Sequence, residues 1–374
     1  MRLYTSIEAL EAEVDKEKLV ILSKSPLRVL SSAVLNGGLT RAKGIINVHV
    51  PKTRDLEIHK CAEAFLKKAA VNLGLDPEEV VGLMTAADLR KVGVVNQKQQ
   101  DTTLCALVTA GIRFSATAGE ATASKLNSQS IEKTCTINII LIIDGNLTEG
   151  CMVDAAKTVT EAKTVVMREL DVRSDFSGDF ASGTVTDSIV VACTKKGPLI
   201  KYAGTGTMLG ELIGKSVKDS LKEAIQKQGK MIANRSLIKR LEERGISFTK
   251  ITALFSETHP TIYGNSKKLD NFREEVQRVF SDPNVAFFVI TALRLDEDEK
   301  MGLIPTGMWD KSLVDGILRT SLVDYLQRKK IAPKRLKIED SSLPNMEGVG
   351  TLTRMVLATI MSYVCSNVNA SSSN

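Results

Sequence analysis

Aromatic side chains are scarce in this sequence and make up 4% of its 374 residues. The formal net charge of +6 is spread over runs such as KEAIQKQGK and RLEERG, in which basic and acidic residues alternate. Recognition of nucleic acid relies on a concentrated basic patch, commonly with aromatic residues on which bases stack. We therefore expect no nucleic-acid partner and interpret the charged runs as solvated helix faces.

Closely spaced cysteines and long apolar runs are also missing. The six cysteines are scattered without a CxxC spacing, and no secretory segment precedes them. This pattern argues against a disulfide framework or a zinc ribbon, and it indicates a reducing, cytoplasmic location. No uncharged apolar run reaches the roughly 18 residues that a membrane span needs, so we expect no span.

Several catalytic motifs are absent as well. The sequence has no HExxH, no clustered Cys/His metal set and no GxSxG elbow, so it supports neither a zinc hydrolase nor an α/β-hydrolase. The stretch GTGTMLGELIG (204–214) has the glycines of a phosphate loop but lacks the lysine of that motif. We predict that it is a turn that opens a helix.

The composition is that of a folded protein in two parts, with 43% hydrophobic and 25% charged residues. In residues 1–229, strand-like runs alternate with helical patterns. This predicts an α/β (α+β) domain built on one mainly antiparallel or mixed sheet with packed helices. In residues 230–365 the β-branched runs disappear and apolar residues recur at spacings of three and four, which predicts an all-α domain. We expect a disordered tail at residues 366–374.

Particular segments carry this division. A helical pattern covers residues 55–73, and the strand candidates are KLVILS, LRVLSSAVL, GIINVHV, VVGLMTAA, TLCALVTAG, CTINIILII and DSIVVACT. Within residues 312–326 of the second domain we expect an apolar stripe of Leu313, Ile317, Leu318 and Leu322, with Asp310 as the cap of the helix.

A helix predicted at residues 148–170 carries a lysine on its apolar face. Thr148 can cap this helix, whose packing face comprises Met152, Ala155, Ala156, Val159, Ala162, Val166 and Leu170. Lys163 lies in the middle of that face, whereas Glu161 points the other way. Because an unpaired buried ammonium is costly, Lys163 either snorkels past the helix edge or reaches a polar site at the edge of the sheet.

Polar side chains also gather in SGTVTDSIVVA (182–192). A glycine turn with Thr184 and Thr186 leads into Asp187 at the head of a strand. Hydroxyls and backbone N–H groups after a glycine can hold an oxyanion, and a carboxylate at a strand end can orient or deprotonate a nucleophile. The alternative is an ordinary polar entry to a strand.

The stretch LSSAVLNGG (30–38) has the same character. Ser31 and Ser32 are candidate nucleophiles, Asn36 can donate to a carbonyl, and Gly37 with Gly38 lets a flat ligand approach the backbone. The alternative is a glycine turn between two strands. Because successive side chains of a strand face opposite sides, one of the two serines can face a site, but not both.

Taken as a set, these stretches resemble the adenosylcobinamide amidohydrolase family of corrinoid salvage. The matching pieces run in order over roughly residues 20–225: VLSSAVLNGGL (29–39), IINVHV (45–50), GLMTAA (82–87), VTAGI (108–112), TIN (136–138), LTEG (147–150), TEAKT (160–164) and GTVTDSIVVA (183–192). The chain departs from the family at Arg113, where the pattern usually continues with asparagine.

The resemblance implies hydrolysis of the amide that joins the corrin propionyl side chain to aminopropanol. The products would be adenosylcobyric acid and 1-amino-2-propanol, for cobamide synthesis. The cobalt-containing corrinoid is then the small-molecule substrate, no resident cofactor is implied, and a divalent metal stays open.

For this reaction we expect Asp187 with Ser32 or Thr184 to supply the activated water or hydroxyl. Lys163 would be the proton donor, and the Gly183 turn with Asn36 would form the oxyanion site. The expected substrate contacts are Ser31, Asn36, Gly37, Gly38, His49, Thr85, Asn138, Glu161, Gly183 and Thr186. For His49, which alternates with Val48 and Val50 on a strand, a place in the core or at its rim is the commoner outcome.

The last 140 or so residues resemble the α-ribazole phosphatase, related to phosphatidylglycerophosphatase A, that is fused to the amidohydrolase in some archaeal proteins. The pieces are LEERGIS (241–247), SDPNVAFFVITALRLDED (281–298), GLIP (302–305), SLVDGILRTSLVDYL (312–326) and MSYV (361–364). The phosphatase has an Asp-Glu pair where this chain has Asp315 and Gly316, and paired aspartates near Thr353 and Arg354. Because a divalent metal and a phosphoryl group require carboxylates, we expect an inactive helical domain.

Two other functions stay open. One is a corrinoid-binding protein without turnover. The other is a bifunctional enzyme whose phosphatase uses Asp310, Asp315 and Glu347. The sequence does not fix the oligomeric state, and a homo-oligomer remains an alternative.

Overall fold

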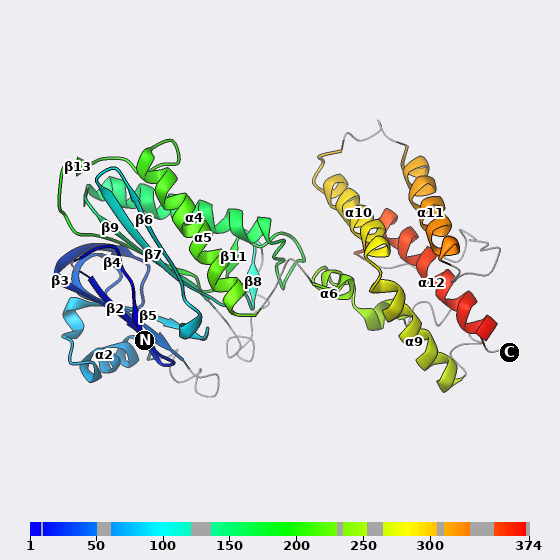
Figure 1. Cartoon of the computed structure of the whole chain (residues 1–374), viewed down its shortest axis with the longest axis horizontal. Helices are drawn as coiled ribbons and strands as arrows, with labels where there is room; N and C mark the ends of the chain where they lie inside the picture. Colours follow the sequence, from blue (N-terminus) through cyan, green and yellow to red (C-terminus); the bar gives the residue numbers. More distant parts are fainter. Residues whose placement is uncertain are drawn as a thin grey trace. The chain divides into compact units, whose positions relative to one another are not determined.

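The computed structural model describes residues 1–8, 10–50, 61–120, 136–229, 235–252, 265–304, 310–329 and 348–371. The chain divides into two compact units, Met1–Asn234 and Arg235–Asn374. In the described residues, the first unit is a sheet with helices and the second consists of helices (Figure 1). The predicted fold class is confirmed. The predicted boundary after residue 229 adjoins residues 230–234, which lie outside the described residues, so the domain limits remain a prediction.

The main sheet of the first unit has nine strands. They are β1 (Arg2–Leu3), β2 (Leu10–Val14), β3 (Lys18–Ser31), β4 (Gly38–His49), β5 (Val80–Thr85), β6 (Gly93–Gln99), β7 (Thr102–Ala110), β9 (Ile137–Asp144) and β12 (Ser188–Cys193). Two small pairs are β8 (Ser115–Ala116) with β11 (Gly183–Thr184), and β10 (Asn146–Leu147) with β13 (Leu199–Ile200). The helices are α2 (Ala62–Asn72), α4 (Glu149–Glu169) and α5 (Met208–Lys227), with 3-10 turns at Pro77–Glu79 and Leu89–Lys91.

Strand β3 anchors the sheet. Its first half pairs with β2 and its second half with β12, while β4 pairs along both halves with a register shift between Leu22 and Leu27. Two predicted strands, KLVILS and LRVLSSAVL, are therefore one strand that is interrupted near Pro26. A proline has no N–H to donate to the ladder, which is why it is found at such irregularities. The sheet is mixed, because β4 with β5 and β9 with β12 are parallel.

The connection between β3 and β4, residues 32–37, is hydrogen-bonded to β12 and to β5, which are not neighbours in the sheet. The Ser32 N–H donates to the Ile189 carbonyl of β12 at 3.0 Å. Three residues later, Leu35 and Gly82 of β5 exchange two hydrogen bonds of 3.1 Å. Asn36 has a φ of 52°, and a Cβ on Gly37 would lie 2.4 Å from the Ala33 carbonyl oxygen. The turn therefore depends on residue types that tolerate a left-handed backbone or close backbone contact.

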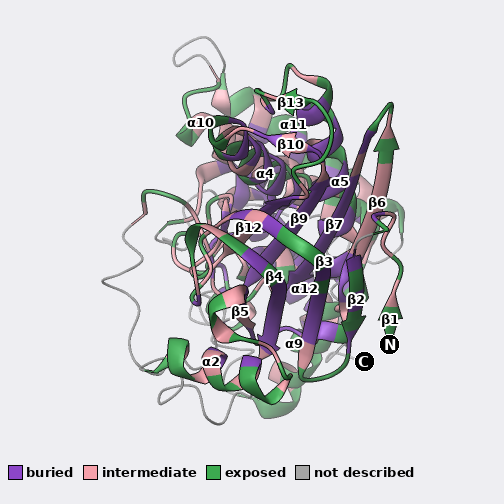
Figure 2. Ribbon diagram, turned by 90° about the vertical axis from the view of Figure 1, so that its left-hand side faces the viewer, coloured by how far each residue is buried: buried purple, intermediate pink, exposed green. Residues whose placement is uncertain are grey.

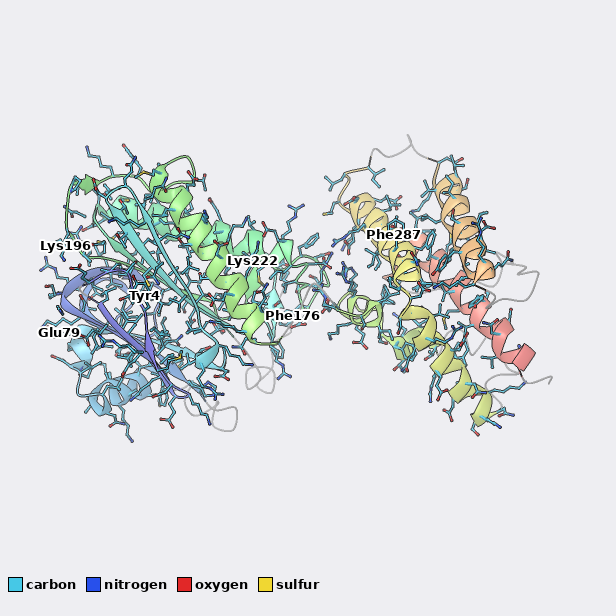
Figure 3. The ribbon with its side chains drawn as sticks, in the orientation of Figure 1. Tyr4, Glu79, Phe176, Lys196, Lys222 and Phe287 are labelled. Atoms are coloured by element: carbon cyan, nitrogen blue, oxygen red, sulfur yellow. The ribbon has the colours of Figure 1, made fainter. Side chains whose placement is uncertain are left out.

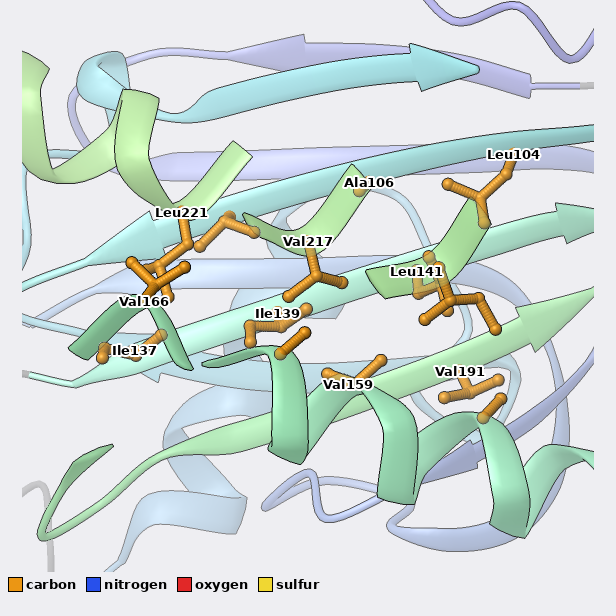
Figure 4. Packing of buried hydrophobic residues seen from close by; sticks show 14 of the residues in the cluster. Leu104, Ala106, Ile137, Ile139, Leu141, Val159, Val166, Val191, Val217 and Leu221 are labelled. Carbon is orange, nitrogen blue, oxygen red and sulfur yellow. The ribbon is translucent and has the colours of Figure 1, made fainter. Parts of the chain in front are cut away.

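Both faces of the central strands are buried (Figure 2). Along β9, Ile139 and Leu141 pack against α4 and α5 (Figure 4). Ile140 and Ile142 pack on the opposite face, with residues of β2 to β5. Successive side chains of a strand face opposite sides, so burial on both sides needs an uninterrupted apolar run. This explains why CTINIILII shows no alternation of polar and apolar residues. Helix α2 covers a third cluster, on β4 and β5.

Helices α4 and α5 begin where the sequence predicts. The Thr148 hydroxyl accepts the Cys151 N–H at 3.1 Å, and the Thr207 hydroxyl accepts the Gly210 N–H at 3.0 Å. GTGTMLGELIG is therefore a turn that opens α5, as predicted. On the solvent side, Glu169 of α4 forms ion pairs with Lys218 and Lys222 of α5 at 2.8 and 2.6 Å; Figure 3 labels Lys222.

The second unit contains α6 (Leu237–Glu242), α9 (Ser266–Phe280), α10 (Pro283–Lys300), α11 (Lys311–Arg328) and α12 (Thr351–Ser371). Asp296 of α10 caps α12, because its carboxylate accepts the N–H groups of Leu352 at 3.1 Å and Thr353 at 2.7 Å. A Cβ at Gly350 would lie 2.2 Å from the Asp296 carboxyl carbon. The approach of α10 to α12 therefore needs a glycine at this position.

Two expectations for this unit are wrong. Helix α12 continues to Ser371, so residues 366–371 are not a disordered tail; Val364, Cys365 and Val368 extend its buried face into the core. Asp310 caps α11 as predicted, but Leu313 and Ile317 are 60% and 56% exposed. The buried stripe of α11 instead comprises Leu318, Leu322 and Leu326, because α12 packs against the side of α11 where every fourth residue from Leu318 lies.

We predict that Asp282→Asn weakens the second unit in a pH-dependent way. Burial raises the pKa of Asp282, but hydrogen bonds from Lys329, Tyr325 and the Asn284 N–H outweigh this effect and lower the pKa from 3.8 to about 2. The stabilisation is therefore complete above pH 3.8 and is lost as the pH falls toward 2. At neutral pH the variant should lose roughly 1 kcal/mol of unfolding free energy.

Urea unfolding can be followed by far-UV circular dichroism, because the described part of the second unit consists of helices. The matched control is Asp324→Asn, whose pair with Arg328 is exposed and whose loss should cost less than about 0.5 kcal/mol. A stability gap between wild type and Asp282→Asn that stays constant down to pH 2 would contradict the assignment.

Candidate active site

Lys163 forms a buried ion pair at the edge of the sheet. It lies on the inner face of α4, is 8% exposed, and its Nζ lies 2.5 Å from Oδ2 of Asp187. Both side chains are 10% exposed. The alternative in which Lys163 reaches bulk solvent is therefore wrong, and the helix delivers its ammonium group to the head of β12.

The Asp187 carboxylate is held on both oxygens. Oδ1 accepts the Thr184 hydroxyl and the Ile137 N–H, the latter at 3.1 Å. Oδ2 accepts the Lys163 ammonium and, at 3.0 Å, the Thr184 N–H. From the described residues, Asp187 thus receives four donors on α4, β9 and β11. We call Lys163, Thr184 and Asp187 the ion-pair cluster.

The ion-pair cluster needs a glycine at position 183, where a side chain would overlap it. A Cβ at Gly183 would lie 2.2 Å from Asp187 Oδ2 and 2.5 Å from Lys163 Nζ. Gly183 and Thr184 form β11, which pairs with Ala116 and Ser115 of β8. The next residue, Val185, donates its N–H to the Phe114 carbonyl at 3.3 Å. The Gly183 turn is thus fixed from one side by β8 and from the other by the ion pair.

Phe114 adopts a strained backbone conformation beside this turn. Its φ is 54°, which is rare for a bulky residue. Its ring lies 6.2 Å from the ring of Phe176, and the neighbouring Ser115 accepts the Asp175 N–H at 2.9 Å. The surrounding contacts hold a conformation that an isolated chain would avoid, as is common at functional sites.

A line of buried polar side chains runs from the cluster into the interior. The Thr136 hydroxyl donates to the Thr186 carbonyl at 2.6 Å, next to Asp187. Two residues along β9, Asn138 donates to the Met84 carbonyl at 2.8 Å and to Asn47 Oδ1 at 3.1 Å. Asn47 in turn donates to the Thr109 hydroxyl at 3.0 Å. Buried amides that lack partners are costly, so this line fixes β4, β5, β7 and β9 to one another.

Ser32 lies close to the cluster in the sheet. Its hydroxyl accepts the Ile189 N–H at 3.0 Å, two residues after Asp187. Ser32 is exposed, whereas Ser31 is half-buried and its hydroxyl accepts the Ala33 N–H at 3.4 Å. The structure thus bonds Ser32 to β12, the strand that begins directly after Asp187.

The turn at Asn36, Gly37 and Gly38 holds two parts of the fold together. Asn36 donates both Nδ2 hydrogens, to the Pro77 carbonyl at 2.7 Å and to the Val80 carbonyl at 2.8 Å. The amide therefore has no hydrogen left for a substrate carbonyl. Gly37 and Gly38 are exposed, and Gly38 has a φ of 88°.

The other expected contact residues differ in their burial. Thr85 is buried and accepts the Ala87 N–H at 3.0 Å, and His49 Nδ1 lies 3.1 Å from the Ala87 carbonyl oxygen. Asn138 is buried in the polar line described above, and Thr186 is exposed beside Asp187. Glu161 is exposed on the solvent side of α4, away from Lys163.

Sequence reasoning missed Thr136, Asn47 and Thr109. Asn47 and Thr136 lie within or beside IINVHV and TIN, and an amide inside an apolar strand is a signal that can be read. Their pairing across the interior depends on the curvature of the sheet. No sequence pattern encodes that curvature.

Two buried thiols of this unit, those of Cys105 and Cys151, are not activated. Burial raises the pKa of Cys105 to about 12 and that of Cys151 to about 11. A cysteine nucleophile must be a thiolate, so neither residue is suited to that role. Within the described ranges no three His, Cys, Asp or Glu side chains converge as metal ligands, and no helix there is long and apolar enough to cross a membrane.

A known protein family matches nearly all of the first unit. The adenosylcobinamide amidohydrolase family matches residues 2–233. The chain belongs to this family. Its members are enzymes that hydrolyse an amide bond.

Two curated relatives are similar to part of the chain. The adenosylcobinamide amidohydrolase of Methanosarcina mazei is 30% identical over 207 residues, which cover 53% of this chain and 90% of the relative. An uncharacterized protein of Methanocaldococcus jannaschii is 31% identical over 231 residues, which cover 58% of this chain and 89% of the relative.

Solved structures resemble the chain weakly. A Pyrococcus horikoshii protein has a TM-score of 0.30 at 12% identity and covers 58% of this chain and 79% of its own. The L-aminopeptidase D-Ala-esterase/amidase of Ochrobactrum anthropi has a TM-score of 0.28 at 12% identity and covers 59% and 83%. Likenesses at these scores do not define the fold.

We predict that Gly183→Ala destabilises the first unit by roughly 1–3 kcal/mol, because the added methyl group overlaps the ion pair. Thermal unfolding followed by circular dichroism measures the change. Gly150→Ala is the matched control, because Gly150 lies in α4 with nothing within 4 Å of its added Cβ. An unchanged melting temperature for Gly183→Ala would show that the cluster is looser than described.

We also predict that removal of Asp187 costs more unfolding free energy than removal of Lys163. Asp187→Ala leaves the Lys163 ammonium buried without another acceptor among the described residues and should cost roughly 3–5 kcal/mol. Lys163→Met should cost less, because the carboxylate keeps three donors. Urea unfolding of both variants tests the order.

The pair of Lys157, which is exposed, and Asp154, which is half-buried, lies on the same helix and supplies the controls. Asp154→Ala and Lys157→Met should each cost less than about 1 kcal/mol. If Lys163→Met were the costlier of the two variants in the buried pair, the three remaining donors would not stabilise Asp187 as described.

Proposed function

We propose that this protein hydrolyses the amide bond of adenosylcobinamide between the corrin propionyl side chain and aminopropanol. The products are adenosylcobyric acid and 1-amino-2-propanol, and the reaction serves cobinamide salvage for cobamide synthesis. Membership of the family supports amide hydrolysis. The observation that carries the proposal is the ion-pair cluster, in which a carboxylate that is held by a buried lysine accepts a hydroxyl group.

The cluster supplies the groups that amide hydrolysis requires. Asp187 Oδ1 accepts the proton of the attacking hydroxyl or water and can return it to the leaving amine. Lys163 fixes Asp187 and balances its charge, so its role as a proton donor becomes indirect. Our candidate for the oxyanion site is narrowed to the Gly183 N–H, because the Thr184 and Val185 N–H groups of the turn are already donated, to Asp187 and Phe114. Asn36 does not share that role, because its amide is already donated.

Substrate recognition is assigned to the surface around Asp187. Thr186, which precedes Asp187 in the sequence, is exposed. Ser32, which is hydrogen-bonded to Ile189 two residues after Asp187, is exposed as well. Gly37 and Gly38 remain candidates for contact with a flat ring, since both are exposed. The buried Asn138 and Thr85 are better suited to holding the strands than to touching a large ligand.

A second candidate is a corrinoid-binding protein without turnover. The observation that favours it is the saturation of Asp187 by four donors from the described residues, which is typical of a carboxylate that pins a turn. Such a pin would hold the ligand-binding surface without taking a proton.

For the second unit we propose a degenerate phosphatase-like domain. The Asp315 side chain, 9% exposed, forms a pair with Arg319 at 3.1 Å, and the Asp296 carboxylate is used to cap α12. Thr353 is fully buried where the resembled family has an acidic residue. Asp310 also serves as a cap, and Glu347 lies outside the described residues. Metal-dependent release of phosphate from α-ribazole phosphate would instead establish a bifunctional enzyme.

The decisive experiment incubates the purified protein with adenosylcobinamide, with and without a chelator, and follows adenosylcobyric acid and aminopropanol by mass spectrometry. We expect both products in equal amounts. Loss of turnover with chelator would indicate metal activation, whereas full turnover would indicate activation by the cluster alone. Corrinoid that binds but is recovered intact would favour the second candidate.

The lysine variants link the activity to the cluster. Lys163→Met should lower kcat by about 10²- to 10⁴-fold, since Asp187 loses the charge that holds it in place. Lys157→Met, on the exposed side of the same helix, should match wild type. Equal activity of the two variants would place the chemistry elsewhere.

A further inference from the structure

The two candidate nucleophiles, Thr184 and Ser32, have hydroxyl groups with different hydrogen-bond partners. Thr184 is half-buried, and its hydroxyl donates to Asp187 Oδ1. The Ser32 hydroxyl accepts a backbone N–H from Ile189, and in the described part of the chain no acidic or basic side chain contacts it. A hydroxyl becomes a nucleophile when an adjacent base takes its proton. Of the two, Thr184 alone has such a base in contact.

Thr184 is also held in place at two points. Its N–H donates to Asp187 Oδ2 at 3.0 Å while its hydroxyl contacts Oδ1 of the same carboxylate. Lys163 and the Ile137 N–H fix that carboxylate from the helix and from β9. A nucleophile that the protein itself positions avoids the entropic cost of capturing and orienting a water molecule.

We infer that Thr184 forms an ester with the corrin propionyl group, and that the enzyme therefore also transfers this acyl group to primary amines. This inference rests on the proposed function and extends it from hydrolysis to amide exchange. The acceptors are small amino alcohols and other unhindered primary amines. The ester is the intermediate common to both reactions: water converts it to the acid, and an amine converts it to a new amide.

The first half-reaction cleaves the amide. Thr184 Oγ1 attacks the carbonyl carbon, and the hydroxyl proton passes to Asp187 Oδ1. The C–N bond then breaks, and the same proton moves to the leaving nitrogen, so that 1-amino-2-propanol departs as a neutral amine. Asp187 is again a carboxylate, and Lys163 keeps its protons throughout.

The second half-reaction releases the acyl group. Water or a primary amine attacks the ester carbon and gives a proton to Asp187, the C–Oγ1 bond breaks, and Oγ1 regains that proton. Water yields the acid, and an amine yields a new amide. A site that releases a primary amine from the acyl carbon must also admit one, because the reverse step follows the same path.

The test adds ethanolamine or hydroxylamine to wild-type protein that is turning over adenosylcobinamide. We expect the ethanolamide or hydroxamate of adenosylcobyric acid beside the acid. The amide-to-acid ratio should rise in proportion to the acceptor concentration. Acid-quenched enzyme should carry the acyl group on the peptide that contains Thr184, as intact-mass and peptide mass spectrometry would show.

Variants identify the nucleophile. Thr184→Val should abolish the adduct and lower both hydrolysis and exchange by about 10²-fold or more, while Thr184→Ser should restore both in part. Because the valine keeps the backbone N–H that bonds Asp187, thermal unfolding close to that of Thr184→Ser would show that the fold is intact. Whatever its rate of turnover, the Ser32→Ala enzyme should carry the acyl group on the same Thr184 peptide as wild type.

The outcomes separate the two levels of the proposal. Absence of hydrolysis in wild type would refute the proposed function itself. Hydrolysis without adduct or exchange product would refute only the ester, and so would an adduct that survives in Thr184→Val. Exchange without adduct, with aminopropanol release that rises linearly with acceptor, would indicate direct attack on the amide and would also overturn the inference.

Discussion

The buried ion pair between Lys163 and Asp187 is the interaction on which the rest of the first unit's site depends. Moving either charge out of water is costly, and attraction in a low-dielectric interior offsets that cost only when the remaining hydrogen-bonding positions are filled. Here Thr184 and Ile137 fill the carboxylate positions that Lys163 leaves. The pair therefore dictates a glycine at 183, the direction of the Thr184 hydroxyl, and the face of α4 that points inward.

The polar line from Thr136 through Asn138 and Asn47 to Thr109 extends this constraint across the interior. Each amide in it is shared between strands that are distant in sequence, so the network favours one arrangement of the curved sheet over others of similar apolar burial. Apolar clusters on both sides of β9 provide most of the favourable burial free energy, whereas the polar line selects the register. Because Thr136 donates to the Thr186 carbonyl, the register of the interior and the position of Asp187 are set together.

Much of this could be predicted from the sequence, and the failures have physical causes. Local signals were reliable: the predicted cap at Thr148 is a hydrogen bond within three residues, the predicted turn at 204–214 opens α5, and the fold class follows from residue periodicity. Lys163 stood out because charge conflicts with an apolar face, yet its partner lies 24 residues away and no local rule could select Asp187. Asn36 was expected to face the ligand, but tertiary contacts with Pro77 and Val80 took its amide. The stripe of α11 failed because Leu313 and Leu318 suit a packed face equally well in sequence, and only the position of α12 decides between them.

The path of residues 32–37 has a consequence for the order of folding. Ser32 is bonded to Ile189, a separation of 157 residues, and the second half of β3 has β12 as its neighbour on that edge. During synthesis the ribosome must therefore add more than half of the first unit after β3 before that edge can be covered. Until then a long apolar strand has open backbone groups that invite pairing with other chains. The polar residues at its end, Ser31 and Ser32, and the irregularity at Pro26 make this exposed edge a poorer template for such pairing during the wait.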